Sequence, residues 1–299
     1  MTGILPVKKP AGFTSFDVIG KLRGVVKTRK IGHSGTLDPM ATGVLPLFFG
    51  GATKVCDMLP NEDKRYVADI KFGIVTDTQD TTGRVLTETE SRVTKTEFEH
   101  VISGFIGRQM QLPPMYSAVK VNGRPLYDLA REGKTVERAQ KEIVVYNIVL
   151  KDFDEHEQTA RIEVSCGKGT FIRTLIHDMG EKLGCGASMS ALERTMAAGF
   201  YISECYTISE IEEMMQSGTF EEHLMPIERL FEDLPRLVLN DFDKRLYRSG
   251  VPLELRKRGW GGIEGNIAVF DESGMLLGIS FMDEEANELK LRKMLNTDK

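Results

Sequence analysis

The sequence predicts an α+β protein, in which a mixed or antiparallel central sheet is flanked by helices, carries an inserted arm and is followed by a small β-rich unit. Residues 67–73 and 161–166 alternate in polarity and are rich in strand formers, and residues 143–150 form a longer β-branched run, typical of a buried strand. Stretches with helical spacing interrupt these runs irregularly, which favours a mixed architecture. The 299 residues suffice for one large domain and one small one.

Three amphipathic helices are predicted. Residues 15–26 place apolar side chains at helical spacing, after a threonine and a serine that are both suitable N-caps. Residues 94–106 begin with Thr-Lys-Thr-Glu and then repeat apolar positions in the same way. Residues 170–183 form the third helix, and Gly184 is expected as the left-handed residue that ends it.

A domain boundary is predicted at Leu234–Pro235, between a large unit of residues 1–234 and a small unit of residues 235–299. An acidic helical stretch ends there, and short strands with glycine turns follow. Residues 266–270 and 275–280 are separated by Asp-Glu-Ser-Gly, which predicts a hairpin.

Composition excludes several classes of protein. Hydrophobic residues make up 41% of the chain and charged residues 28%, as in ordinary globular proteins. No apolar run approaches the roughly 20 residues of a membrane helix, and the N-terminus lacks a signal-peptide pattern, so a cytoplasmic location is expected. The four cysteines and five histidines form no C-x-x-C or H-E-x-x-H motif, which disfavours a disulfide framework and a metal site.

The net charge of −5 argues mildly against a nucleic-acid partner, but the charges are unevenly distributed. Residues 1–60 contain eight Lys or Arg and three acids, and residues 120–141 contain six and three. Residues 201–235 contain nine acids and a single arginine. A basic face and an acidic back would explain this pattern, and ordinary solvated faces would explain it equally well.

A glycine-rich segment, Gly32–Pro46, contains the first candidate catalytic residue, Asp38. Its glycines and proline predict a tight irregular loop, and close approach of a ligand is one reason for such a loop. Pro39 holds Asp38 extended, so that the carboxylate is presented at a turn, where it can act as a base or a nucleophile. The alternative is a turn that Asp38 and Ser34 merely cap.

Two further segments combine cations with an aromatic residue or a glycine turn. Lys64 and Arg65 precede Tyr66 at the start of a predicted strand, an arrangement that suits base stacking with phosphate contacts. Gly-Lys-Gly-Thr leads into a helix with Arg173 in its first turn, where the helix dipole disfavours a cation. A carboxylate partner elsewhere would explain that position. A half-buried strand tyrosine and a surface arginine are the respective alternatives.

The insertion at about residues 108–145 is predicted to form a projecting arm. Gln111–Pro125 contains Pro-Pro and an Asn-Gly turn, and a short basic helix, residues 126–132, follows it. Lys120 and Arg124 are expected to contact backbone phosphates. The alternative is a plain connecting hairpin.

Together and in this order, these segments resemble the TruB family of tRNA pseudouridine synthases. Gly-His-Ser-Gly-Thr-Leu-Asp-Pro-Met-Ala-Thr-Gly around Asp38 is similar to the family's catalytic motif, and Lys-Pro-Ala-Gly at residues 9–12 is similar to its N-terminal segment. Lys64–Tyr66 with Gly73–Asp80 resembles its tyrosine motif, and Gly169–Arg173 resembles its arginine motif.

The resemblance covers about residues 1–230, and residues 235–299 look like the small RNA-binding PUA domain of bacterial members. It implies isomerisation of uridine 55 in the T arm of tRNA to pseudouridine, without a metal, nucleotide or redox cofactor. The C1′–N1 bond is broken, the uracil rotates, and a C1′–C5 bond forms. The target base must first be flipped out of the folded loop, at a cost of a few kcal/mol.

The resemblance also implies roles for individual residues. Asp38 is essential, Arg173 holds it ionised and oriented, and Tyr66 stacks on the flipped uracil and assists loss of the C5 proton. The other substrate contacts that it implies are His33, Lys9, Asp80, Leu192, Lys64, Lys120 and Arg124.

Two other functions remain open at this point. One is a non-catalytic protein that binds or folds RNA, and the other is a hydrolase with an aspartate nucleophile. The joint presence of Asp38, Tyr66 and Arg173 favours catalysis, and no motif supplies the general acid or metal that the hydrolase would need near Asp38. A monomer is expected.

Overall fold

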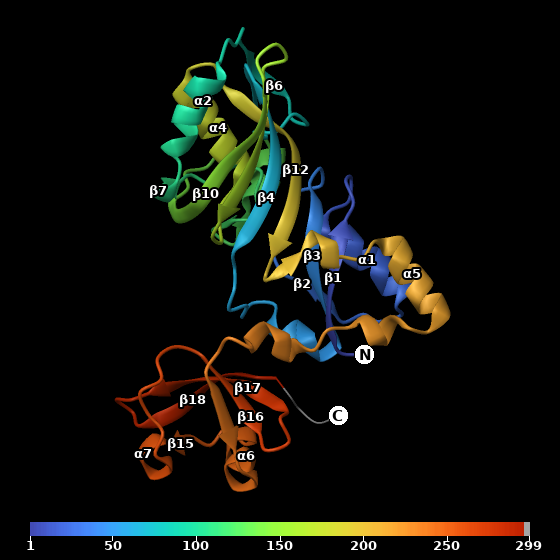
Figure 1. The fold of residues 1–299 in the computed structure, drawn as a ribbon, viewed down its shortest axis with the longest axis vertical. Coiled ribbons are helices and arrows are strands. Elements are labelled where there is room, and N and C mark those ends of the chain that lie inside the picture. The colour runs from blue at the N-terminus through green and yellow to red at the C-terminus, as the bar shows by residue number, and fades with distance from the viewer. Residues whose placement is uncertain (296–299) are drawn as a thin grey trace.

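The computed structural model describes residues 1–295, and its architecture is α+β, as predicted. Figure 1 shows one large sheet that runs along most of the molecule with helices against it, and a smaller β-rich unit at the C-terminal end. Among residues 1–295, no helix is long and apolar enough to cross a membrane.

The large sheet has nine strands. They are β1 (Gly3–Lys9), β2 (Ile31–His33), β3 (Thr42–Phe49), β4 (Lys64–Phe72), β7 (Gly107–Gln111), β10 (Lys141–Asp154), β11 (Thr159–Cys166), β12 (Ala187–Ala197) and β13 (Phe200–Tyr201). Their order is β1-β3-β12-β4-β11-β10-β7, with β2 beside β3 and β13 beside β12. The pair β3–β12 is parallel and the other pairs are antiparallel, so the sheet is mixed. This parallel pair joins the N-terminal strands to the long central strands.

Helices cover the large sheet in two groups. The α-helices of the chain are α1 (Ser15–Val25), α2 (Lys95–Ser103), α3 (Leu126–Arg131), α4 (Ile172–Leu183), α5 (Ile208–Ser217), α6 (Asp241–Arg248) and α7 (Leu255–Arg258). The 3₁₀ turns are η1 (Gly50–Val55), η2 (Ile202–Glu204), η3 (Phe220–His223) and η4 (Ile227–Phe231). Helices α2 and α4 pack together beside β10 and β12, whereas α1 and α5 pack beside the N-terminal strands (Figure 1).

The three predicted helices are confirmed, together with their caps. Thr14 caps α1 and Thr94 caps α2, each by accepting a hydrogen bond from the backbone N–H three residues later. The acidic residue at that third position accepts a bond from the cap N–H in return, which completes a capping box. Gly184 follows α4 in the left-handed conformation, with φ of 77°.

One strand prediction and the length of one predicted loop are wrong. Strand β10 is not buried, because only β7 lies beyond it in the sheet and its side chains alternate between buried and exposed. The glycine-rich segment is irregular over a shorter range than expected, since β3 already begins at Thr42. Strand β1 pairs with β3 over its whole length, a long-range contact that the local pattern does not contain.

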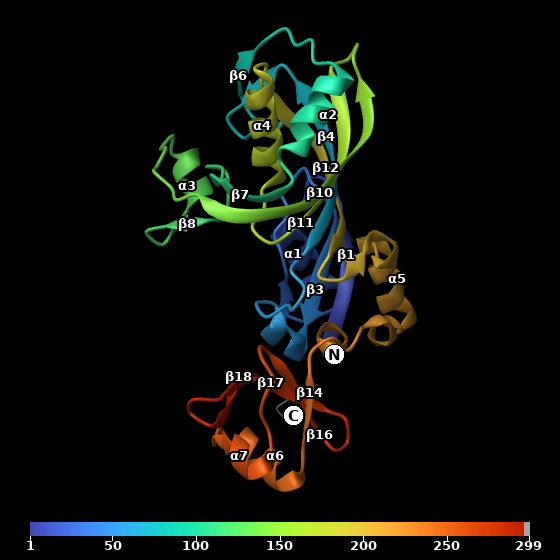
Figure 2. The ribbon, with the colours of Figure 1, turned by 60° about the vertical axis from the view of Figure 1, so that its left-hand side comes forward.

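The predicted arm lies between β7 and β10 and projects from the sheet in Figure 2. It contains the hairpin β8 (Lys120–Val121) and β9 (Arg124–Pro125), followed by α3. Asn122 and Gly123 have φ of 51° and 82°, positive at both central positions as a type I′ turn requires. A second ribbon, β5 (Ile74–Thr76) with β6 (Val85–Glu88), follows β4.

The C-terminal unit is a five-stranded sheet with two short helices, α6 and α7. Its strands are β14 (Arg236–Leu239), β15 (Leu253–Glu254), β16 (Ile267–Asp271), β17 (Leu276–Asp283) and β18 (Glu288–Met294). The predicted hairpin is β16–β17, which pair antiparallel. Phe270 and Leu276 of this unit share an apolar cluster with Ile4, Phe48 and Phe231 of the large unit. Removal of the C-terminal unit would therefore expose apolar surface at Ile4 and Phe48.

Candidate active site

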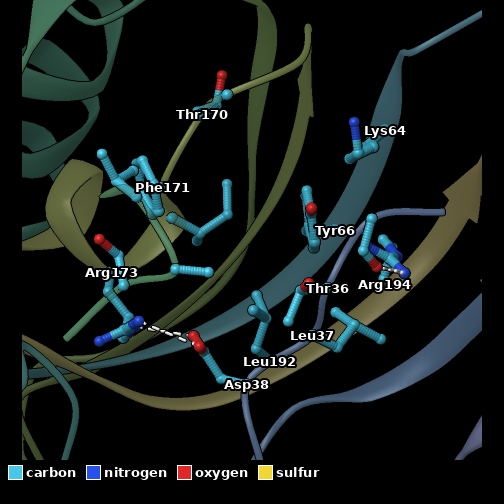
Figure 3. A pocket seen from close by; sticks show the side chains of 16 residues that line it. Thr36, Leu37, Asp38, Lys64, Tyr66, Thr170, Phe171, Arg173, Leu192 and Arg194 are labelled. Carbon is cyan, nitrogen blue, oxygen red and sulfur yellow. Dashed lines mark hydrogen bonds and ion pairs between the residues drawn. The ribbon is translucent and has the colours of Figure 1, made fainter. Parts of the chain in front are cut away.

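A cavity of about 370 Å³ opens where the aspartate loop (residues 34–41), β4, β12, the start of α4 and the base of the arm meet. Its volume is within the range of small-ligand sites. The residues that line it include Gly35, Thr36, Leu37, Asp38, Lys64, Tyr66, Ser117, Phe171, Arg173, Leu192 and Arg194. Figure 3 shows Asp38 and Arg173 facing each other, with Tyr66 and Leu192 beside them. The three predicted catalytic residues thus meet in one cavity.

The aspartate loop is held by hydrogen bonds to the segment before and at the start of α1. The Leu37 N–H donates to Ser15 Oγ over 2.9 Å, and the Gly12 N–H donates to the Pro39 carbonyl over 2.8 Å. Asp38, between these two anchors, is therefore presented at a defined place, as its position before a proline predicts.

Asp38 forms a two-point ion pair with Arg173. Nε of Arg173 lies 2.8 Å from Oδ2 of Asp38, and Nη2 donates to Oδ1 over 3.1 Å. Arg173 also donates to the carbonyls of Thr78 and Tyr116, each over 2.8 Å. The arginine side chain is 5% exposed and the aspartate side chain 35% exposed. Asp38 is the carboxylate partner that the position of Arg173 in the first helical turn required, and the two contacts fix the orientation of the carboxylate.

Asp80 is a second carboxylate close to Arg173. Its Oδ2 lies 3.9 Å from Nε of Arg173. Its Oδ1 accepts hydrogen bonds from the Thr78 hydroxyl over 2.9 Å and from the Thr82 N–H over 3.0 Å. Because Asp80 is buried and occupied in this way, it orients Arg173 and does not line the cavity.

Tyr66 reaches the cavity from β4, where its neighbours across the sheet are Val164 and Arg194. Burial raises the pKa of its hydroxyl, and the nearby guanidinium of Arg194 opposes that effect. The side chain is 6% exposed. Tyr66 therefore presents a neutral phenol to the cavity at physiological pH, fixed in place by the strands on either side of it.

Three other predicted contacts lie in or near the cavity. Lys64 and Leu192 line it, and burial lowers the pKa of Lys64. His33 is half-buried at the start of the aspartate loop and meets the exposed ring of Phe16 edge-on, with centroids 6.5 Å apart. Burial lowers the pKa of His33, so its imidazole is neutral at pH 7.

Lys9 does not lie where a substrate contact requires it, which corrects the expectation from the family resemblance. Its side chain has no exposed surface. Its ammonium donates to the carbonyls of Phe13, Pro10 and Pro39 over 2.5, 2.9 and 3.2 Å. It therefore ties the end of β1 to the aspartate loop from inside the protein.

We expect turnover to fall as the pH rises through about 8, because burial lowers the pKa of Lys9 to about 8. A neutral amine has two hydrogens for three carbonyls, so the contact to Pro39 beside Asp38 weakens. The pKa in the unfolded chain is higher, so the unfolded state binds more protons between the two values and stability rises with pH there. The fall in rate is therefore not caused by unfolding of the protein.

A single-turnover rate profile from pH 6 to 10 checks this expectation. Lys9→Met should be slow, and its rate should show no fall near pH 8. Lys8→Met, which removes the exposed neighbouring charge, should keep the pH profile of the unaltered protein. If the rate of Lys9→Met still falls near pH 8, the group that titrates there is another residue.

Lys120 and Arg124 lie on the exposed hairpin of the arm, as predicted. Arg124 pairs with Glu132 of the same arm over 2.5 Å.

No role was predicted from the sequence for Arg194, which is fully buried beside Tyr66. The sequence feature that could have pointed to it is its position two residues after Leu192, which lines the cavity. Among residues 1–295, no group of three or more His, Cys, Asp or Glu could hold a metal ion.

Comparison with known proteins identifies matching families for most of the large unit. Residues 23–172 match the family model of the TruB family pseudouridylate synthase N-terminal domain. Residues 173–232 match that of the tRNA pseudouridylate synthase B C-terminal domain. The tRNA pseudouridine synthase B of Bacillus subtilis is 44% identical over 288 residues, which cover 94% of this chain and 93% of that protein. The Clostridium perfringens protein of that name is 39% identical over 99% of both chains.

The fold is also that of one chain in a solved protein complex. The matched chain in the crystal structure of a Cbf5-Nop10-Gar1 complex superposes with a TM-score of 0.75 at 25% identity. The match covers 98% of this chain and 85% of that chain, so it includes the C-terminal unit.

Proposed function

Because the chain belongs to the TruB family of pseudouridylate synthases, we propose that it isomerises uridine 55 in the T arm of tRNA to pseudouridine. The observation that carries this proposal is the two-point pair of Asp38 with Arg173 in a cavity that Tyr66 also lines. The names of its relatives, tRNA pseudouridine synthase B, support tRNA as the substrate.

The cavity accounts for the main requirements of the reaction. The uridine enters as a flipped nucleotide, with its base against Tyr66 and Leu192, because both side chains line the same cavity. The Asp38 carboxylate then lies next to the sugar and the base, where it promotes cleavage of the C1′–N1 bond. After rotation of the uracil, C5 bonds to C1′, C5 loses its proton and N1 gains one. Reactant and product have the same atoms, so no co-substrate is consumed.

The test is incubation of the protein with a T-arm stem-loop that carries tritium at C5 of its uridines. We expect tritium release from a single uridine, with pseudouridine at position 55 after nuclease digestion and mass spectrometry of the derivatised product. A stem-loop with cytidine at position 55 should release none. Tight binding of the stem-loop without pseudouridine formation would favour the non-catalytic RNA-binding alternative and contradict the proposal.

We further propose that residues 1–234 form the catalytic domain, with the arm as an RNA contact, and that residues 235–299 form a PUA-like RNA-binding domain. A monomer acting in the cytoplasm is part of the proposal, and the formation of the whole cavity by one chain supports it. The exposed basic residues Arg256 and Lys257 on α7 give the C-terminal unit a surface for phosphates.

Charge reversal on α7 tests the role of the C-terminal unit without exposing its apolar contact with the rest of the chain. Arg256→Glu should raise the Kd for full-length tRNA by about 5- to 10-fold and lower the salt dependence of binding, because phosphate contacts release counterions. The single-turnover rate at saturating protein should stay within about twofold. Arg92→Glu, which reverses an exposed arginine on the loop before α2, is the control. Equal Kd values for the two variants would contradict the domain proposal.

A further inference from the structure

Arg194 links the aspartate loop to Tyr66. It lies on β12, between β3 and β4, where its backbone is paired in parallel with Gly43 and antiparallel with Tyr66. One residue thus neighbours the end of the loop that carries Asp38 and the strand that carries the cavity tyrosine. This position follows from the mixed sheet, because β12 alone joins these two strands.

The side chain of Arg194 closes the aspartate loop across its base. Nε donates to the Val44 carbonyl over 2.7 Å, and Nη2 donates to the Gly35 carbonyl over 2.8 Å. These acceptors lie on either side of Asp38 along the chain, and Figure 3 shows Arg194 at the end of the cavity away from Asp38. A side chain that bonds both flanks limits how far the loop can open.

Two glycines in the aspartate-loop region fit closely against Arg194. At Gly43, with φ of 102°, an added Cβ would lie 2.2 Å from the carbonyl oxygen of Arg194. At Gly35, with φ of 73°, it would lie 3.1 Å from Nη1. The loop therefore approaches this arginine as closely as a backbone without side chains allows.

The charge of Arg194 is costly in this place. The side chain is fully buried, and its bonded acceptors are carbonyl oxygens rather than a carboxylate. Its Nη1 is buried and has no acceptor within residues 1–295. Burial of a guanidinium with incomplete partners opposes folding, and an apolar side chain of similar length would avoid that penalty. Packing alone does not explain an arginine at this position.

We propose that Arg194 is a positioning residue of the isomerase, which fixes the aspartate loop against Tyr66 and favours negative charge on the Tyr66 oxygen. Such charge builds up whenever the phenol shares its proton with an acceptor on the bound uridine. A buried cation on the residue paired with Tyr66 across the sheet acts strongly there, because little water screens it. This inference rests on the proposed function and assigns the cavity a second fixed charge besides the Asp38–Arg173 pair.

The test compares Arg194→Met, which removes the charge at similar length, with Arg194→Lys, which keeps a charge but reaches fewer acceptors. For Arg194→Met we expect the single-turnover rate on the T-arm stem-loop to fall about 100-fold, as for other misplaced or weakened catalytic groups. The Kd for the stem-loop should stay within about threefold, because the residue is covered by protein. Arg194→Lys should recover at least about a tenth of the lost rate.

Arg229→Met is the control, because Arg229 is a partly exposed arginine of the large unit, paired with Glu204 over 2.6 Å outside the cavity. It should lose stability without losing rate. An unchanged rate in Arg194→Met, or a rate in Arg194→Lys no higher than in Arg194→Met, would overturn the inference. If Arg194→Met does not fold, the Arg194→Lys rate decides: an unaltered Kd with a reduced rate supports the inference, and an unaltered rate refutes it. Failure of the unaltered protein to make pseudouridine would instead remove the proposed function itself.

Discussion

Replacement of Asp38 by asparagine is expected to lower the single-turnover rate by on the order of 10⁴-fold while RNA binding stays within a few-fold. The substitution keeps the size of the side chain and removes its negative charge. Binding depends on the surface around the cavity, whereas the charge acts on the reacting nucleotide. A loss confined to the rate would place Asp38 in the transition state rather than in substrate recognition.

Asp38→Glu separates the charge from its position. The carboxylate remains but is displaced by one methylene, and a displacement of about 1 Å can cost about 100-fold in rate. We therefore expect Asp38→Glu to be faster than Asp38→Asn and much slower than the unaltered protein. Both variants should be measured by tritium release with saturating protein, and their Kd values by filter binding.

Asp69→Asn is the matched control for Asp38→Asn, because Asp69 forms a similar two-point pair with Arg161. Nε and Nη2 of Arg161 donate to the two oxygens of Asp69 over 2.6 and 2.9 Å, outside the cavity. Asp69→Asn should therefore leave the rate unchanged. Comparable losses in the two asparagine variants would trace the effect to the sheet and contradict the catalytic assignment.

Local sequence predicted the parts of the fold that depend on local interactions. The starts of α1 and α2 could be located because Thr14 and Thr94 each precede an acidic residue by three positions, which is all a capping box needs. The turn at Asn122 was also predictable from local sequence, because Asn-Gly favours the positive φ that both central positions of this turn need. Strand β12 was not predicted, since its small and polar residues form a strand only where β4 and β3 lie on both sides of it.

The same limit applies to individual side chains in the site. Asp38 and Arg173 could be singled out because each occupies a position that its local structure makes unusual, before a proline and in a first helical turn. Lys9 and Arg194 have no such local mark. Each is a cation on a strand. Only the packing of distant segments buries them and brings Lys9 to the Pro39 carbonyl and Arg194 to the Gly35 carbonyl. Charge patterns along the chain cannot reveal burial that distant strands impose.

Replacement of Arg173 by alanine is expected to lower both the stability of the protein and its rate. The change leaves Asp38 without its cation and frees the carbonyls of Thr78 and Tyr116, which belong to the segment after β5 and to the base of the arm. Removal of one partner from a buried pair costs several kcal/mol, and since Asp38 is about one-third exposed we expect about 2–4 kcal/mol in the free energy of unfolding. Denaturant unfolding measures this loss, and Arg161→Ala, on the exposed pair with Asp69, should cost less than about 1 kcal/mol.

A second substitution separates the structural part of the Arg173 effect from the catalytic part. In the double variant Asp38→Asn with Arg173→Ala, Asp38 no longer leaves an unpaired carboxylate, although Asp80 still lacks its cation, so part of the stability lost in Arg173→Ala should return. The rate should not return, because the charge that drives the reaction is missing. Arg173→Lys keeps one cation beside Asp38, but an ammonium cannot reproduce the planar fork that bonds the carboxylate and two carbonyls together. Its rate should fall about 100-fold or more, because Asp38 is no longer held in place. A fully active Arg173→Lys would mean that Asp38 needs only a nearby positive charge, and the two-point geometry would then be dispensable.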